Sequence, residues 1–138
     1  MSSWKLEFFE ERRESPITFW VHKGVDEEKN SYHECVEFNP PMPLKDPVKG
    51  YPFLTVTALG FDMTFSSLHE VEHFIAVMEQ KNLPTTLSLS VQRGADNGPN
   101  SHWLSRFPAK YKGWTKRVKL VSAVKKAKES VVLSDERF

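Results

Sequence analysis

Hydrophobic and polar residues alternate along much of the first two-thirds of the chain. A period of two is typical of strands that bury one face, and β-branched and aromatic residues favour the same structure. Residues 1–66 are therefore predicted to be mainly β, and a further strand is predicted after them. The predicted strands are 4–8, 17–21, 32–38, 53–58, 61–65 and 86–92.

The period changes at Ser67. Ser67 and Glu70 stand three residues apart, the spacing of a helix capping box. Apolar residues then follow at helical spacing: Leu68, Val71, Phe74, Ile75 and Met78. The pattern predicts a helix over 67–81, ended by Asn82 and Pro84.

The last third of the chain has turn residues followed by two helical patterns. Turn chemistry fills 96–100, a short helix is predicted over 101–107, and a longer helix over 114–128. Residues 129–138 are predicted to be a tail. The elements together predict one α+β domain over 1–138, with a mostly antiparallel sheet of four to six strands. One central helix and one or two C-terminal helices are expected to pack on that sheet.

Proline and cysteine usage refine this picture. Residues 39–52 hold five of the nine prolines and are predicted to form a rigid surface loop. The single cysteine, Cys35, excludes an intramolecular disulfide, and the charged N-terminus does not resemble a signal peptide. The longest clean apolar run, 74–78, is far too short for a membrane span. A cytoplasmic protein with no membrane partner is expected.

The net charge of +1 conceals a strong asymmetry. Residues 1–50 carry seven basic and ten acidic side chains, and residues 51–92 carry one and four, so each part has a net charge of −3. Residues 93–138 carry eleven and four, a net charge of +7. Such a basic segment attracts nucleic acid or an acidic protein surface.

The basic segment is the loop and helix over 93–128. It holds ten of the nineteen Lys and Arg residues, with Asp96 as its only acid. Cations neutralise phosphates, and aromatic side chains stack on the bases of single strands. The expected anion or phosphate contacts are Arg93, Arg106, Lys110, Lys112, Lys116, Arg117, Lys119 and Lys126. The possible stacking residues are Trp103, Tyr111 and Trp114.

A structural explanation of the same aromatic residues stays open. On the helix over 114–128, the apolar stripe consists of Trp114, Val118, Val121 and Val124, with lysines on the opposite side. In that interpretation Trp114 belongs to the core, and Trp103 pins the short helix beneath it.

One stretch invites a metal hypothesis. His69, Glu70 and His73 match H-E-x-x-H, and the match resembles the zincin family over these five residues. The resemblance implies that the two histidines bind zinc and that Glu70 is the general base. The alternative is a capped helix whose histidines face solvent, because the apolar stripe centres on Ile75 and Met78. No metal or other cofactor is predicted.

Other catalytic combinations are weaker. Cys35 with His33 lacks a third orienting group, and the turn chemistry of 96–100 explains Asp96 without a triad. The leading hypothesis is a non-enzymatic protein that contacts nucleic acid or a nucleoprotein complex through residues 93–128. The first alternative is a protein interaction module, such as an inhibitor or assembly subunit, that meets an acidic partner. The second is a zinc-dependent hydrolase.

Overall fold

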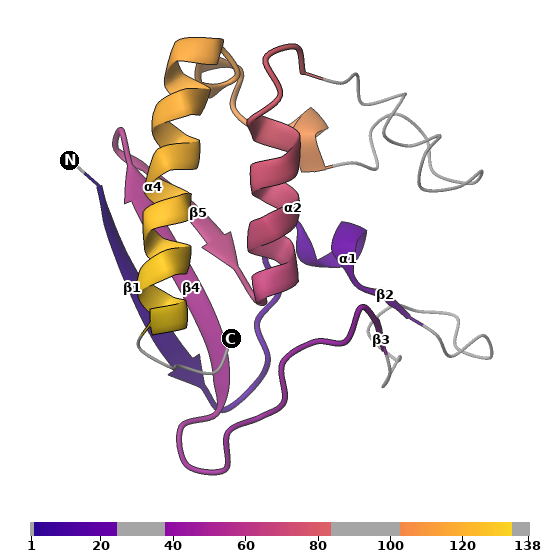
Figure 1. Cartoon of the computed structure of the whole chain (residues 1–138). Coiled ribbons are helices and arrows are strands. Elements are labelled where there is room, and N and C mark those ends of the chain that lie inside the picture. The colour runs from indigo at the N-terminus through magenta and orange to yellow at the C-terminus, as the bar shows by residue number, and fades with distance from the viewer. Residues whose placement is uncertain (1, 25–37, 84–102, 134–138) are drawn as a thin grey trace.

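The computed structural model describes residues 2–24, 38–83 and 103–133 (Figure 1). Five strands lie in these ranges: β1 Ser3–Phe9, β2 Lys23–Gly24, β3 Phe38–Asn39, β4 Tyr51–Ala58 and β5 Phe61–Phe65. The α-helices are α1 Thr18–Val21, α2 Leu68–Met78 and α4 Trp114–Leu133, and two 3₁₀ turns are η2 Trp103–Arg106 and η3 Ala109–Tyr111. The α+β class is confirmed. None of the described helices is both long and apolar enough to cross a bilayer.

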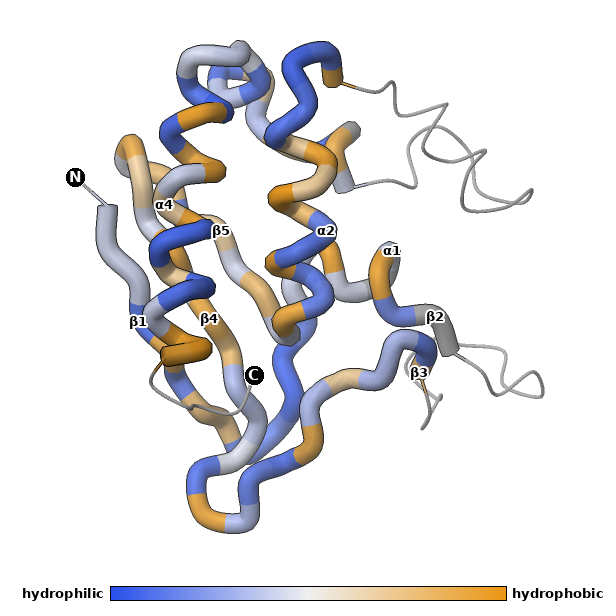
Figure 2. The backbone as a smooth tube through the Cα atoms, in the orientation of Figure 1, coloured by the Kyte–Doolittle hydropathy of each residue, from blue (hydrophilic) through white to orange (hydrophobic). Residues whose placement is uncertain are grey.

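The main sheet is antiparallel, with the strand order β1-β4-β5. Leu54 of β4 lies opposite Leu6 on one side and opposite Phe65 on the other. Burial alternates strictly along β4, so one face of the sheet is apolar and the other is partly open to solvent. Helices α2 and α4 both pack on the apolar face (Figures 1 and 2). The described sheet has three strands instead of the predicted four to six, and β2 and β3 form a separate pair.

The core lies between this sheet and the two helices. Leu54 and Phe65 are fully buried, and the ring of Phe65 meets that of Phe74 edge to face at 5.5 Å. Leu120 and Val124 of α4 are equally buried. Each such side chain contributes on the order of 1.5–3 kcal/mol relative to exposure, so this layer holds the helices on the sheet.

The strand predicted over 17–21 is wrong, because these residues form the short helix α1. The turn is set by polar side chains: the backbone N–H of Ser15 donates to Oγ1 of Thr18 at 2.8 Å. Ile17 and Trp20, three residues apart, then point to the same side and are buried. Of the predicted strand 32–38, only Phe38 lies within the described residues, where it begins β3. The predicted strand 86–92 lies outside them.

Three other predictions agree with the structure to within a few residues. Strand β1 covers the predicted 4–8, the β4–β5 hairpin covers 53–58 and 61–65, and α2 begins directly after Ser67. The predicted end of the last helix at 128 is wrong, since α4 continues to Leu133. Val131 is only 2% exposed, so the core continues for another turn beyond the predicted end.

Two glycines shape the strand connections. Leu59 and Gly60 both have positive φ angles, 54° and 72°, which is the conformation of a two-residue type I′ hairpin turn. Gly50 precedes β4 with a φ of 105°. A Cβ at Gly50 would lie 2.2 Å from the carbonyl oxygen of Phe9, so the end of β1 can approach only because no side chain is there.

Replacing Gly50 by alanine is expected to lower the free energy of unfolding by about 3 kcal/mol or more, because the change adds a backbone clash to an unfavourable φ. Gly60→Ala is the matched control. Gly60 also has a positive φ, but open space surrounds it, so a loss of about 1 kcal/mol is expected. Urea denaturation of both variants measures the difference. Equal losses would contradict the close approach to Phe9.

Candidate binding surface

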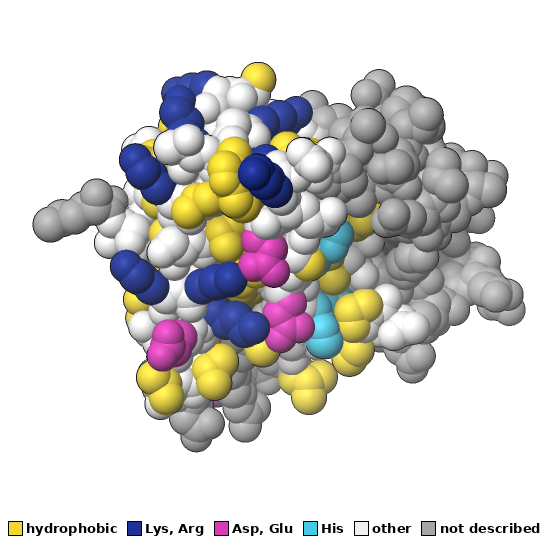
Figure 3. Space-filling view, turned by 45° about the horizontal axis from the view of Figure 1, so that its top comes forward, with side chains coloured by type: hydrophobic (Ala, Val, Ile, Leu, Met, Phe, Trp, Pro, Cys, Tyr) yellow, Lys and Arg dark blue, Asp and Glu magenta, His cyan; other side chains and the backbone are white. Residues whose placement is uncertain are grey.

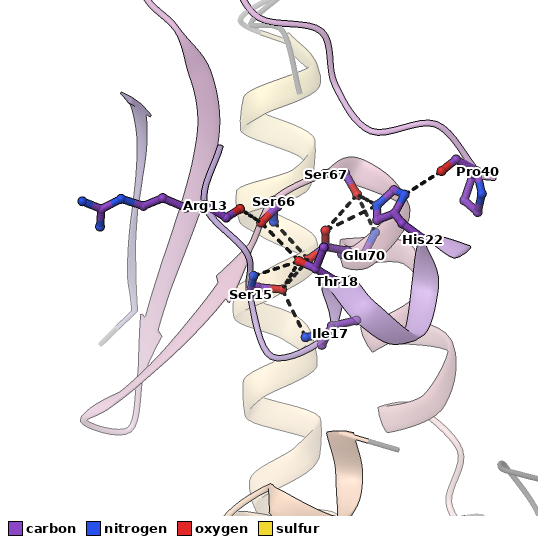
Figure 4. A network of polar contacts seen from close by, with 9 residues as sticks. All are labelled: Arg13, Ser15, Ile17, Thr18, His22, Pro40, Ser66, Ser67 and Glu70. Atoms are coloured by element: carbon purple, nitrogen blue, oxygen red, sulfur yellow. Dashed lines mark hydrogen bonds and ion pairs between the residues drawn. The ribbon is translucent and has the colours of Figure 1, made fainter. Parts of the chain in front are cut away.

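The polar centre of the molecule is a buried carboxylate. Glu70 is 0% exposed, and its Oε1 accepts hydrogen bonds from the side chains of Ser15 and Thr18 and from the backbone N–H of Ser66 (Figure 4). The Thr18 and Ser66 bonds measure 3.0 and 3.1 Å. A buried carboxylate is costly unless it is well bonded, and these donors satisfy it.

His22 completes this network on the other oxygen. Its Nε2 lies 3.4 Å from Oε2 of Glu70 and 2.6 Å from Oγ of Ser67. Its Nδ1 lies 2.7 Å from the carbonyl oxygen of Pro40, which can only accept, so Nδ1 carries a proton. A serine beside a histidine invites a catalytic interpretation. Here His22 is 0% and Ser67 1% exposed, and Ser67 Oγ accepts from the Glu70 N–H as a helix cap. The pair is therefore structural.

The H-E-x-x-H stretch takes part in this network and in the core. Glu70 is buried with its carboxylate hydrogen-bonded, His69 is exposed, and His73 is half-buried. Nε2 of His73 accepts a hydrogen bond of 2.9 Å from Nε1 of Trp103, so this nitrogen is not free for a metal. Desolvation lowers the pKa of His73 to about 4, although the charge of Glu70 opposes the shift. Within 2–24, 38–83 and 103–133, no three potential metal ligands gather.

Two of the three possible stacking residues are buried in the core, as the structural explanation of the aromatic residues expected. Trp103 is 3% exposed and stacks on Phe74, with ring centroids 5.7 Å apart. Tyr111 is 6% exposed and stacks on Phe61 at 4.7 Å. The Tyr111 hydroxyl also donates to the carbonyl of Leu59 at 3.1 Å, which fastens η3 to the hairpin turn.

Trp114 departs from the structural explanation. The apolar stripe predicted it as core, yet Trp114 is 41% and Val118 is 47% exposed. At about 100° per residue, the buried side of α4 centres about 100° away from Trp114 around the helix. The buried residues of α4 are Arg117, Leu120, Val121, Ala123, Val124, Ala127 and Val131.

Arg117 belongs to the buried side of α4, so the prediction of a surface anion contact is wrong for it. It is 3% exposed, and its guanidinium donates to carbonyls at the end of α2 and just beyond. The bond to Met78 measures 3.1 Å and that to Lys81 2.9 Å, and Gln80 accepts at 2.5 Å. Its Nε donates to the carbonyl of Lys112 at 2.7 Å. Arg117 thus caps the C-terminus of α2 and neutralises its dipole.

Most of the other predicted cations lie at the surface. Lys112 is half-buried, and Arg93 lies outside the described ranges. The remaining predicted cations are exposed: Arg106, Lys110, Lys116, Lys119 and Lys126.

Ion pairing divides the lysines of α4 into two groups. Lys125 pairs with Glu79 at 2.8 Å, and Lys128 with Glu72 at 3.7 Å, both on the side toward α2. In the part of the chain with assigned positions, no carboxylate pairs with Lys116, Lys119 or Lys126.

These lysines adjoin the exposed apolar residues. One hollow is lined by Trp114, Val118 and Lys126 together with Glu79, which follows α2, and other residues of α4. Another is lined by Leu59, Val118 and Lys119 with Lys126. We call Leu59, Trp114, Val118, Lys119 and Lys126 the α4 outer face. Figure 3 shows hydrophobic side chains beside Lys and Arg over the α2–α4 side of the molecule. Sequence reasoning found the lysines but missed the apolar members, because it placed Trp114 and Val118 in the core.

Arg117→Lys is expected to lower the free energy of unfolding by about 2–4 kcal/mol, because one ammonium cannot serve carbonyls on both α2 and the 109–113 turn. Thermal denaturation measures the loss. Lys119→Arg is the control, since Lys119 is exposed on the same helix and should tolerate the change. An Arg117→Lys variant as stable as the parent would contradict the capping role.

The stability contributed by His73 is expected to depend on pH. In the unfolded chain this group binds a proton near its ordinary pKa of 6.5, whereas the folded pKa is about 4. The contribution is therefore complete above pH 6.5 and falls by up to about 3 kcal/mol as the pH drops from about 6.5 to about 4. Urea denaturation across this range should show a steeper fall for the parent than for His73→Gln. Identical slopes would contradict the buried neutral state.

No family model, curated protein or solved structure matches the chain. The function proposed below therefore rests on the contacts and exposure described above.

Proposed function

We propose that this protein is a non-enzymatic interaction module whose α4 outer face binds an acidic segment of another protein. The observation that carries this proposal is the combination of exposed apolar side chains with unpaired lysines. Trp114 and Val118 are nearly half exposed in the first turns of α4, and Lys119 and Lys126 have no acidic partner among the described side chains. The compartment we propose is the cytoplasm, in keeping with a chain that has a single cysteine.

The apolar part of the face favours a protein partner. Aromatic residues surrounded by polar ones are typical anchors of protein interfaces. Val118 lines two neighbouring hollows on α4 and Trp114 lines one of them, so a partner side chain has a concave place to pack. Phosphates would make no use of Val118 or Leu59.

The lysines make binding selective for an acidic partner and raise the rate of association. Unpaired cations at the rim steer an oppositely charged partner and repel a basic one, with a modest effect on final affinity. Lys125 and Lys128, in contrast, are already paired with glutamates of α2. The partner we propose is therefore an amphipathic acidic helix, with apolar residues toward Trp114 and carboxylates toward Lys119 and Lys126.

Nucleic acid or a nucleoprotein complex is the second candidate. The exposed cations of the basic segment favour it, since phosphate contacts need only accessible charge. The burial of Trp103 and Tyr111 leaves Trp114 as the one described member of the three that could stack on a base. This candidate therefore predicts binding by charge alone, with little dependence on sequence.

Binding of synthetic probes tests both candidates. The first probe is a labelled helical peptide with Leu and Phe on one side and Glu on the other, and the second is a peptide of the same composition with scrambled order. Fluorescence anisotropy should show tighter binding of the amphipathic peptide. Trp114→Ala and the double variant Lys119→Glu/Lys126→Glu should each weaken it by about tenfold or more.

The matched control is the double variant Lys45→Glu/Lys49→Glu, which makes the same charge change on the 39–52 loop and should leave peptide binding unchanged. A labelled double-stranded oligonucleotide is the third probe. Oligonucleotide binding that falls steeply between about 50 and 200 mM salt, survives Trp114→Ala and exceeds peptide binding would favour the second candidate. Equal affinity for the amphipathic and scrambled peptides would overturn the first.

A further inference from the structure

We propose that β1 is a self-association edge that pairs antiparallel with the β1 of a second copy of this chain. β1 is the outer strand of the order β1-β4-β5, and its inner edge is taken by β4. In Figure 1 no described element lies beyond it. The outer edge therefore presents backbone N–H and C=O groups that another strand can pair with.

The opposite edge of the sheet differs. β5 is also terminal in the strand order, but side chains from two distant segments lie beside it. Ile17, Trp103 and Phe107 line the same small hollow as β5. Three side chains of β1, in contrast, are open. Trp4 is 40% exposed, and the side chains of Lys5 and Glu7, which lie 3.4 Å from each other within the strand, are 65% and 44% exposed.

The sequence of β1 is complementary to itself in one register. When Leu6 lies opposite Leu6 of the second copy, Lys5 lies opposite Glu7, and Glu7 opposite Lys5. Two opposite-charge pairs then form on the open face of the sheet. On the helix-covered face, Trp4 of each copy lies opposite Phe8 of the other. Cross-strand pairs of both kinds stabilise antiparallel sheets.

Neighbouring registers lack this complementarity. A shift of the second strand by two residues in one direction places Lys5 opposite Lys5. A shift by two residues in the other direction places Glu7 opposite Glu7. Like charges directly opposite destabilise a sheet. A shift by an odd number of residues places the polar face of one strand beside the apolar face of the other. The charges of β1 therefore select a single pairing, with a two-fold axis at Leu6.

The association is expected to be weak and to depend on concentration, because one seven-residue strand offers a contact well below the area of a stable interface. Sedimentation velocity of the full chain over a wide concentration range should show a monomer–dimer equilibrium. Lys5→Glu and Glu7→Lys should each weaken dimerisation by about tenfold or more, since each change turns two attractive pairs into repulsive ones.

Mixing makes the test specific. An equimolar mixture of the Lys5→Glu and Glu7→Lys chains should form heterodimers, because opposite charges again face each other. The double variant Lys5→Glu/Glu7→Lys should dimerise like the parent. A variant that had merely lost its fold would show neither rescue. Circular dichroism checks that each variant remains folded.

Two controls separate this proposal from the binding function. Lys45→Glu, a charge change outside β1, should leave dimerisation unaltered, and so should the double variant Lys119→Glu/Lys126→Glu. A parent chain that is monomeric at all concentrations would overturn the proposal, as would single variants that dimerise as well as the parent. Failure of peptide binding would have no bearing on it.

Discussion

The structure depends most on one buried negative charge. A carboxylate taken out of water costs several kcal/mol unless hydrogen bonds replace its hydration. The donors to Glu70 come from the segment before α1, from α1 itself and from the residues that lead into α2. His22 extends the network to the backbone of Pro40. Segments far apart in the sequence must all be in place before the charge is satisfied, so the network strongly restricts alternative packings.

A second buried group holds the other end of the same helix. Glu70 lies in the first turn of α2, where the helix dipole favours a negative charge, and Arg117 binds carbonyls at its last turn and just beyond, where the dipole favours a positive one. Helix α2 is thereby tied to α1 at its start and to α4 at its end. The orientation of α4 follows, because the side that carries Arg117 must face α2. Trp114 and Val118 are left outside for that reason.

The local pattern of the sequence predicts those elements whose determinants are local. Alternation identifies β1 and the β4–β5 hairpin, and the spacing of Ser67 and Glu70 identifies the start of α2. The pattern fails at 17–21. These β-forming residues form a helix because Ser15 and Thr18 donate hydrogen bonds to the carboxylate of Glu70, more than fifty residues away in the sequence.

The candidate surface was predictable only in part for the same reason. Exposed lysines follow from charge alone. The burial of Arg117 cannot be predicted in this way. Its partners are backbone carbonyls at and just beyond the end of another helix, and every residue has a backbone carbonyl, so no sequence pattern marks them. The predicted apolar stripe of α4 is confirmed at Val121 and Val124, which are buried. It is wrong at Trp114 and Val118, because the buried side of the helix also carries Arg117 and faces α2.

The placement of both long helices on one face of the sheet affects how many binding surfaces a dimer would offer to one partner. A two-fold axis that relates antiparallel edge strands runs perpendicular to the sheet, so a pair joined through β1 would carry all its helices on the same side. Both α4 outer faces would then be available to a single partner. A ligand with two acidic segments would bind the second site at a high effective concentration, and its avidity could exceed the affinity of either site by orders of magnitude.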